Sequence, residues 1–266
     1  RDREHGRIWR LLPASAPKSQ SFVLFDPQGQ QPHRITRDRF VALLESPNMY
    51  HRTTAQRVLL ESDVQFDFDV DACLRDLLHA SASPLAKLHA LHLLEQRQPL
   101  RSEDLRMALT DADYRVRVHG VKLCKSTSIS PDVATQLRSM VDDDDASVRL
   151  QLAAVLAGLE NNADALLSLA RTHGDERWMD AAILSSLTNA APLLLRMLAE
   201  PELQDGPRKL LERLSASVAG TRDLQTISSV IGLLPECHPD VQQMCLNGLV
   251  SAMDRWPAQV RWSGRK

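Results

Sequence analysis

The clearest candidate metal ligands in this chain are His89 and His92, in the segment Leu-His-Ala-Leu-His. A spacing of three places both imidazoles on one face of a helix, where they could hold one ion. Catalytic zinc usually takes three protein ligands, and no third ligand follows at a metal-binding spacing. Since leucines flank the two histidines, we interpret them as a structural or surface pair and predict no metal site.

Four cysteines offer a second kind of chemistry, because paired thiols can hold metals, disulfides or haem. None forms Cys-x-x-Cys, and the Cys-x-x-Cys-His sequence that attaches a c-type haem is absent. Each cysteine falls at an apolar position of a helical pattern, where a reduced thiol packs as a small hydrophobe. The four are Cys73, Cys124, Cys237 and Cys245. We therefore predict that this chain itself holds no cofactor.

The acidic run Asp67, Asp69 and Asp71 has the spacing that opens an EF-hand calcium loop. Such a loop needs glycine at its sixth position and glutamate at its twelfth, where this chain has Ala72 and Leu78. The N-terminus of a helix explains the run better, because carboxylates there accept hydrogen bonds from unpaired backbone N–H groups.

A second acidic run, four consecutive aspartates at 142–145, has the same explanation, so a capped turn is favoured over a weak cation site. The chain also lacks a glycine-rich phosphate loop, Gly-x-Ser-x-Gly and His-Glu-x-x-His. We predict no catalytic residues and expect this segment not to be an enzyme by itself.

The elements that carry these residues form a repeat. The segments from Asp111 and from Asp143 both read Asp-x-Asp-x-x-Val-Arg, and both continue as an apolar helix. The acidic residues suit the first turn of that helix, and the valine starts its buried stripe. Weaker copies begin roughly every 30 to 35 residues, which is the signature of a helical repeat array.

A second amphipathic segment precedes each of these helices, so the chain reads as about seven helical hairpins over 36–256. One hairpin cannot bury both of its apolar stripes, whereas stacked hairpins bury a continuous core. We predict an all-α fold, specifically a right-handed α-solenoid. No run of 18 apolar residues occurs, so no membrane span is expected.

The Asp-x-x-Val-Arg element resembles the HEAT-repeat family, in which aspartates and arginines form ladders between neighbouring hairpins. The resemblance is strongest over 102–158. It implies a structural rather than a chemical role for the ladder residues. These are Arg52, Asp111, Asp113, Arg117, Asp143, Asp145 and Arg149.

Two further motifs resemble a family of large bacterial envelope proteins, the sorbosone-dehydrogenase-like membrane-bound dehydrogenases. His-Gly-Arg-Ile-Trp-Arg-Leu-Leu-Pro (5–13) resembles the strand that closes their β-propeller. The run from Phe40 to Glu61, with Arg52-Thr-Thr-Ala-Gln-Arg, resembles the start of their HEAT region, although Tyr50 and His51 replace the usual tryptophans.

This resemblance implies a domain plan, and we expect the chain to be a piece of a longer protein. Residues 1–13 would be the closing strand of an upstream propeller, 14–35 a linker, 36–256 the HEAT-like solenoid, and 257–266 a tail or cut linker. In this family a cytochrome c domain follows the HEAT region. The resemblance therefore implies haem c in that domain of the longer protein, and a quinone cofactor in its dehydrogenase-like propeller. A location in the bacterial periplasm or cell envelope is also implied.

We therefore expect a non-catalytic scaffold or spacer, with a propeller and a cytochrome c domain as neighbours. The alternative is a free-standing module whose concave groove binds a protein. Nucleic acid is not expected as a partner, because 34 acidic residues outnumber 32 basic ones and aromatic residues make up only 4% of the chain.

Overall fold

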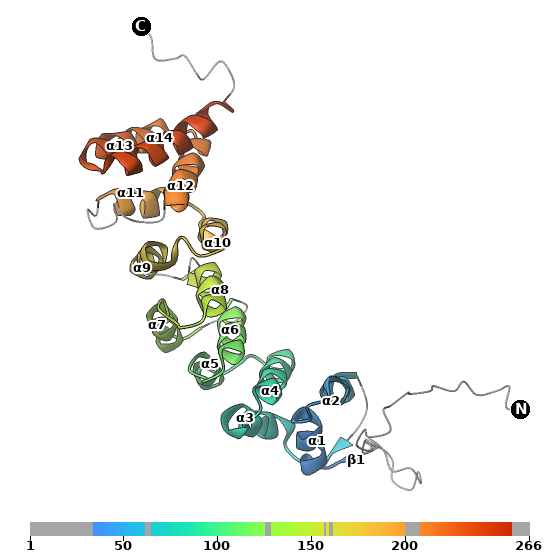
Figure 1. The fold of residues 1–266 in the computed structure, drawn as a ribbon. Helices are drawn as coiled ribbons and strands as arrows, with labels where there is room; N and C mark the ends of the chain where they lie inside the picture. Colours follow the sequence, from blue (N-terminus) through green and yellow to red (C-terminus); the bar gives the residue numbers. More distant parts are fainter. Residues whose placement is uncertain are drawn as a thin grey trace, which may run out of the picture. The chain divides into compact units, whose positions relative to one another are not determined.

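A computed structural model of the chain describes residues 34–61, 65–125, 129–156, 158–159, 162–199 and 208–256. In this part of the chain 14 α-helices follow one another and pack mainly as sequential pairs. The all-α prediction is confirmed, and the arrangement is consistent with a helical repeat (Figure 1). The chain divides into two compact units, Arg1–Phe68 and Asp69–Lys266. The expected propeller strand (1–13) and tail (257–266) lie outside the described residues.

In the described residues of the first unit, α1 (Arg37–Leu44) and α2 (Met49–Glu61) form a helix pair. Two short strands, β1 (Arg34–Ile35) and β2 (Gln65–Phe66), pair in parallel beside it. Strand β1 occupies the last two positions of the segment expected to be a linker, and 14–33 lie outside the described residues. Phe40 is fully buried and lies with its ring centroid 5.5 Å from that of Phe66, so aromatic packing joins the strands to the helices.

The described residues of the second unit form twelve α-helices and one short 3-10 turn, η2 (Leu234–Glu236). The helices are α3 (Val70–Ala80), α4 (Pro84–Arg97), α5 (Ser102–Leu109), α6 (Tyr114–Leu123), α7 (Pro131–Ser139), α8 (Ala146–Leu156), α9 (Ala163–His173), α10 (Met179–Ser186), α11 (Ala191–Ala199), α12 (Arg208–Gly220), α13 (Leu224–Leu233) and α14 (Pro239–Met253). Consecutive second helices contact one another from α4 through α14. First helices contact one another from α3 to α7 and again from α9 to α13. The unit is thus built of two helix layers.

Local sequence explains where these helices begin. Asp69 accepts a hydrogen bond from the backbone of Ala72 and caps α3, which agrees with reading this acidic run as a helix N-terminus. Ser83 and Ser130 cap α4 and α7, and in both helices proline follows at the first position. Leucines and alanines then fill the interface between the layers. No helix in the described residues is long and apolar enough to cross a membrane.

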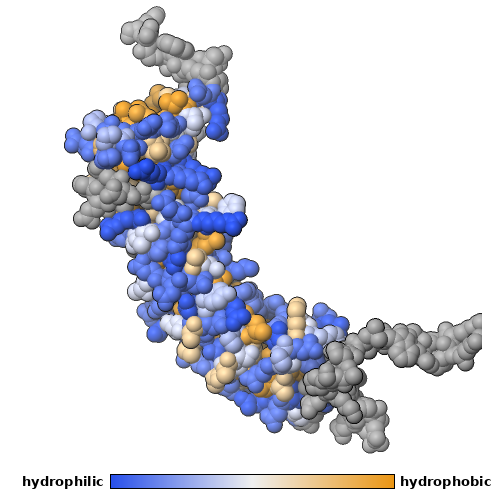
Figure 2. Space-filling view, viewed as in Figure 1, coloured by the Kyte–Doolittle hydropathy of each residue, from blue (hydrophilic) through white to orange (hydrophobic). Residues whose placement is uncertain are grey.

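The turn before α10 is longer than one tight turn. Residues 174–178 form turns, and α10 starts at Met179. Trp178, the residue before the helix, has a left-handed backbone with φ at 70°. Figure 2 shows a mostly hydrophilic surface over the second unit, with apolar side chains gathered over α13 and α14.

Candidate functional site

The turns that lead into α2, α6 and α8 share one hydrogen-bond pattern, which we call the arginine turn. In α6, Asp111 accepts from the backbone of Asp113, and Asp113 accepts from the backbone of Arg115. Six residues after Asp111, Arg117 Nη1 donates to the Asp111 carbonyl oxygen at 3.0 Å. The side chain of the arginine therefore locks the turn that precedes its own helix.

The other two arginine turns repeat this geometry. In α8 the three positions are Asp143, Asp145 and Arg149, and Arg149 Nη1 again donates to the carbonyl oxygen of the first. In the first unit, Arg52 Nη1 donates to the Ser46 carbonyl oxygen at 2.6 Å. All seven residues expected to form the ladder thus lie in these three turns.

Cations of one second helix also reach the turn of the next second helix. Arg117 donates through Nε and Nη2 to the two carboxylate oxygens of Asp143, both at 2.7 Å. Lys87 Nζ lies 2.6 Å from Asp111 Oδ2. These two contacts, with the next one, form a series that we call the charge ladder.

The third rung joins Arg149 to Glu176, in the turn before α10, through Nε and Nη2. His173 Nδ1 lies 2.9 Å from the same carboxylate. Sequence reasoning missed Lys87 and Glu176 as ladder members. Lys87 could have been found, because it follows the cap Ser83 by four residues, as Arg117 follows Asp113.

The Arg117–Asp143 rung is held away from bulk water, with side-chain exposures of 15% and 8%. Burial by itself would raise the pKa of Asp143, but hydrogen bonds from Arg117 and from the Asp145 backbone bring that pKa below its ordinary value. The same hydrogen bond raises the pKa of Arg117. The pair therefore stays ionised over the physiological range.

Asp113 makes its side-chain contacts inside its own turn. Its carboxylate binds Arg115, two residues away, with contacts of 2.9 and 2.7 Å. That hydrogen bond holds the pKa of Asp113 below its ordinary value. Asp113 thus both caps α6 and pairs with a neighbouring arginine.

The histidine pair with the short contact joins two helices, and its members do not lie along a single helix. His92 Nε2 of α4 lies 2.7 Å from His119 Nδ1 of α6. Burial, followed by the charges of His119, Lys122 and His89, lowers the pKa of His92 to about 4. Within the described residues, no three His, Cys, Asp or Glu side chains form a group that could hold a metal ion.

The cysteines are all buried and reduced in this structure. Burial raises the pKa of the Cys124 thiol to about 12, and its Sγ contacts the Gly120 carbonyl oxygen. A thiol with so high a pKa is a poor nucleophile at neutral pH. The four positions behave as parts of the core.

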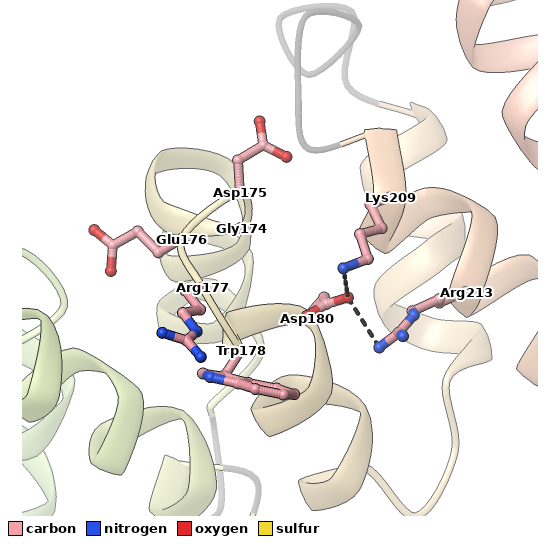
Figure 3. A pocket seen from close by; sticks show the side chains of 8 residues that line it. All are labelled: Gly174, Asp175, Glu176, Arg177, Trp178, Asp180, Lys209 and Arg213. Carbon is pink, nitrogen blue, oxygen red and sulfur yellow. Dashed lines mark ion pairs between the residues drawn. The ribbon is translucent and has the colours of Figure 1, made fainter.

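A hollow on the second unit lies where the charge ladder ends (Figure 3). It measures about 300 Å³ and opens between the turn before α10 and the start of α12. Trp178 forms one wall and is 60% exposed, with the Arg177 guanidinium 5.4 Å from its ring centroid. The lining residues are Gly174, Asp175, Glu176, Arg177, Trp178, Asp180, Lys209 and Arg213.

Asp180 lies in this hollow and is only 4% exposed. Lys209 Nζ and Arg213 Nη1, both of α12, approach its Oδ2 to 3.4 and 2.9 Å. Two cations therefore neutralise the carboxylate, and the lining as a whole carries three acidic and three basic residues. This balance gives neither a general base nor a strong field for a charged ligand.

The sequence gives no match when it is compared with protein-family models and with curated proteins.

Proposed function

We propose that this chain is a non-catalytic helical-repeat scaffold that holds protein partners or neighbouring domains at a set spacing. The observation that carries the proposal is the charge ladder. Three partly buried rungs, Lys87–Asp111, Arg117–Asp143 and Arg149–Glu176, join four successive second helices. Each rung ties the turn that precedes one second helix to the previous second helix.

Such rungs suit a spacer because they limit how far one helix pair can rotate relative to the next helix pair. A bidentate arginine–carboxylate contact fixes the relative orientation of its partners as well as their distance. Arg117 also bonds the carbonyl oxygens of Asp111 and Ala112, so one side chain holds two turns at once. The ladder arginines, with the carboxylates and carbonyl oxygens that they contact, thus serve to pack one repeat against the next.

The HEAT-like, right-handed solenoid is part of the same proposal, supported by the arginine turns and their spacing. The two sequence motifs support a position between a dehydrogenase-like β-propeller and a cytochrome c domain in the bacterial envelope. In that setting the longer protein would carry haem c and a quinone cofactor, and this segment would transmit neither electrons nor substrate.

A second candidate, a free-standing protein-binding module, is favoured by exposed apolar side chains at the beginnings of second helices. Leu85, Tyr114 and Trp178 are 36%, 43% and 60% exposed, and all three lie in or beside the first turn of such a helix. A partner that recognises several repeats would meet one such anchor on each.

Absorption spectra separate the two candidates. The full-length gene product should show the reduced bands of a c-type haem, while the purified 266-residue chain should show none and should have no dehydrogenase turnover with an artificial electron acceptor. Haem, quinone or metal bound in stoichiometric amount to the 266-residue chain would overturn the scaffold proposal. A full-length product without haem would favour the binding module.

The spacer role has its own test in the full-length protein. Arg117→Ala combined with Arg149→Ala should slow electron transfer to the haem while leaving the haem spectrum intact, because the rungs that set the spacing are gone. Arg115→Ala is the matched control, since Arg115 pairs within its own turn. Equal rates in all three proteins would contradict the spacer.

A further inference from the structure

Trp178, which lines the hollow of Figure 3, is an unusual residue for its position in the fold. Its backbone is left-handed, with φ at 70°, a conformation that favours glycine and is costly for a bulky side chain. Its ring is 60% exposed, so it adds little to the core in return. Folding alone would therefore favour a smaller residue here. Because tryptophan is enriched among the residues that dominate binding energy, the hollow is a candidate contact site.

The acidic groups that line the hollow are not equally available to a ligand. The Glu176 carboxylate accepts hydrogen bonds from Arg149 of α8, and its side chain points away from Asp180 (Figure 3). Asp180 is only 4% exposed and already faces two cations. Of the three acids in the lining, only Asp175 is exposed. The even balance of charge in the lining therefore hides a local difference.

The cations of the lining keep hydrogen-bond donors for a ligand. Lys209 and Arg213 lie four residues apart on α12, and their side chains are 68% and 47% exposed. A lysine has three N–H donors and an arginine has five, so the one carboxylate of Asp180 cannot use all of them. The exposed Arg177 lies over the ring of Trp178. The hollow thus places an aromatic ring beside unused cationic donors.

We propose that the hollow binds an acidic segment of a partner protein, in which a glutamate or aspartate lies next to an aromatic side chain. The carboxylate accepts hydrogen bonds from Lys209 and Arg213, a charge-assisted contact that suits the guanidinium fork. The neighbouring ring packs on Trp178. At about 300 Å³ the hollow is at the lower end of ligand pockets, which suits one or two side chains and not a folded element.

Charge complementarity favours a carboxylate over a phosphate. Because Glu176 is paired with Arg149, the three cations of the lining exceed its two other acids by one. One carboxylate balances that difference, whereas a phosphate monoester would bring a charge of about −2 close to the buried Asp180. This inference rests on the proposed function, since it names the chemistry of one partner that the scaffold holds.

Titration with the dipeptide acetyl-Glu-Phe-amide, followed by NMR of the isotope-labelled 266-residue chain, tests the proposal. The indole N–H signal of Trp178, assigned with Trp178→Phe, should move and saturate with a Kd of about 1 mM, as expected for so small a contact. Acetyl-Gln-Phe-amide, which has nearly the same shape but no charge, should bind about tenfold more weakly.

Replacing the two α12 cations should abolish binding of the glutamate peptide. Because their removal alone would leave Asp180 buried without its cations, the variant combines Lys209→Gln and Arg213→Gln with Asp180→Asn, and circular dichroism checks its fold. The matched control is Lys122→Gln with Lys125→Gln, which removes two exposed cations from the end of α6 and its cap and should bind like the parent.

Four results would overturn the proposal. They are a Trp178 signal that does not move at about ten times the expected Kd, equal affinity in the triple variant and the parent, tighter binding of the Gln peptide or of acetyl-Lys-Phe-amide, and a larger response to adenosine monophosphate, which would make the occupant a nucleotide. The absorption spectra test the scaffold separately. If the peptide fails while those spectra are as expected, only the ligand of the hollow is refuted.

Discussion

The charge ladder and the C-terminal helices of the same unit hold their neighbours in different ways. From α4 to the turn before α10, a cation on each second helix reaches forward to an acid in the next turn. At α12, Lys209 and Arg213 reach back to Asp180 of α10, while Arg208 reaches forward to Asp240 of α14 at 2.8 Å. Arg208 and Asp240 are both exposed, and beside this pair the backbones of α12 and α14 approach each other closely.

The difference teaches that repeats can be joined either by directed polar rungs or by close backbone approach. A rung tolerates some separation because long side chains span it. The α12–α14 contact depends on Gly248, where an added Cβ would lie closer than van der Waals contact to the Glu212 carbonyl oxygen and 2.9 Å from Ser215 Cβ. Substitutions in the two regions should therefore lower the free energy of unfolding by different amounts.

The largest effect is expected for Gly248→Ala. The methyl group would push α14 away from the α12 backbone, so the free energy of unfolding should fall by about 3 kcal/mol, the upper end for overpacking a well-filled contact. Urea unfolding followed by circular dichroism measures this loss.

Substitutions at two other glycines give stability changes with which the loss at Gly248 can be compared. Gly120→Ala should cost less, because its Cβ would meet Ala108 Cβ at 3.0 Å and nothing closer. Gly232→Ala should leave stability equal or slightly higher, since its Cβ would meet nothing within 4 Å and alanine favours helix. A loss at Gly248 no larger than that at Gly232 would refute close approach as the basis of the α12–α14 contact.

Breaking a rung is expected to come next. Arg117→Ala leaves the carboxylate of Asp143, 8% exposed, without its bidentate partner and should lower the free energy of unfolding by about 2 kcal/mol. Arg213→Ala should cost less than 1 kcal/mol, or about the value of an exposed pair, since Arg213 is 47% exposed and Lys209 still reaches Asp180. Chemical denaturation of both variants gives the comparison.

Arg115→Ala is the control for removing an arginine from α6, and its unfolding midpoint should match that of the parent. Equal losses for Arg117→Ala and Arg213→Ala would mean that the forward and backward ion pairs contribute alike, and the comparison between the two regions would fail.

A small effect is expected from pH, and it tests the α4–α6 contact. In the unfolded chain His92 binds a proton near its ordinary pKa of 6.5, but in the fold it does so only near 4. Since the unfolded state binds more protons between these values, stability is complete above pH 6.5 and falls as the pH drops toward 4. Because His92 is only partly buried, we expect a loss of about 1 kcal/mol.

Urea midpoints at pH 7.5 and pH 4.5 measure this loss, and His92→Gln should reduce it. The exposed His79 provides the control, because His79→Gln should leave the pH dependence of the parent unchanged. A parent chain that is more stable at pH 4.5 than at pH 7.5 would contradict the sign of the lowered pKa.

Much of the architecture can be predicted from the sequence. The apolar stripes predict helices, and the caps Asp69, Ser83 and Asp113 predict where α3, α4 and α6 begin. The shared Asp-x-Asp-x-x-Val-Arg pattern predicts two equivalent turns, which have the same hydrogen bonds in the structure. These features are local, so residues within about two turns of one another determine them.

Contacts between helices were harder to predict. The pairing of His92 with His119, rather than with His89, depends on how α4 and α6 are set against each other. Glu176, the last rung, lies in the irregular turn before α10, in which Trp178 has a left-handed backbone. Neither position repeats the motif, so no spacing in the sequence marks it.

The sequence by itself determined that this chain is helical, where most of its helices start and which faces are apolar, because hydrophobic periodicity and capping act over a few residues. The tertiary structure alone decided which charges meet and which apolar face stays uncovered within the described residues. These features depend on the distance and rotation between helices that are 25 or more residues apart, as Arg117 and Asp143 are.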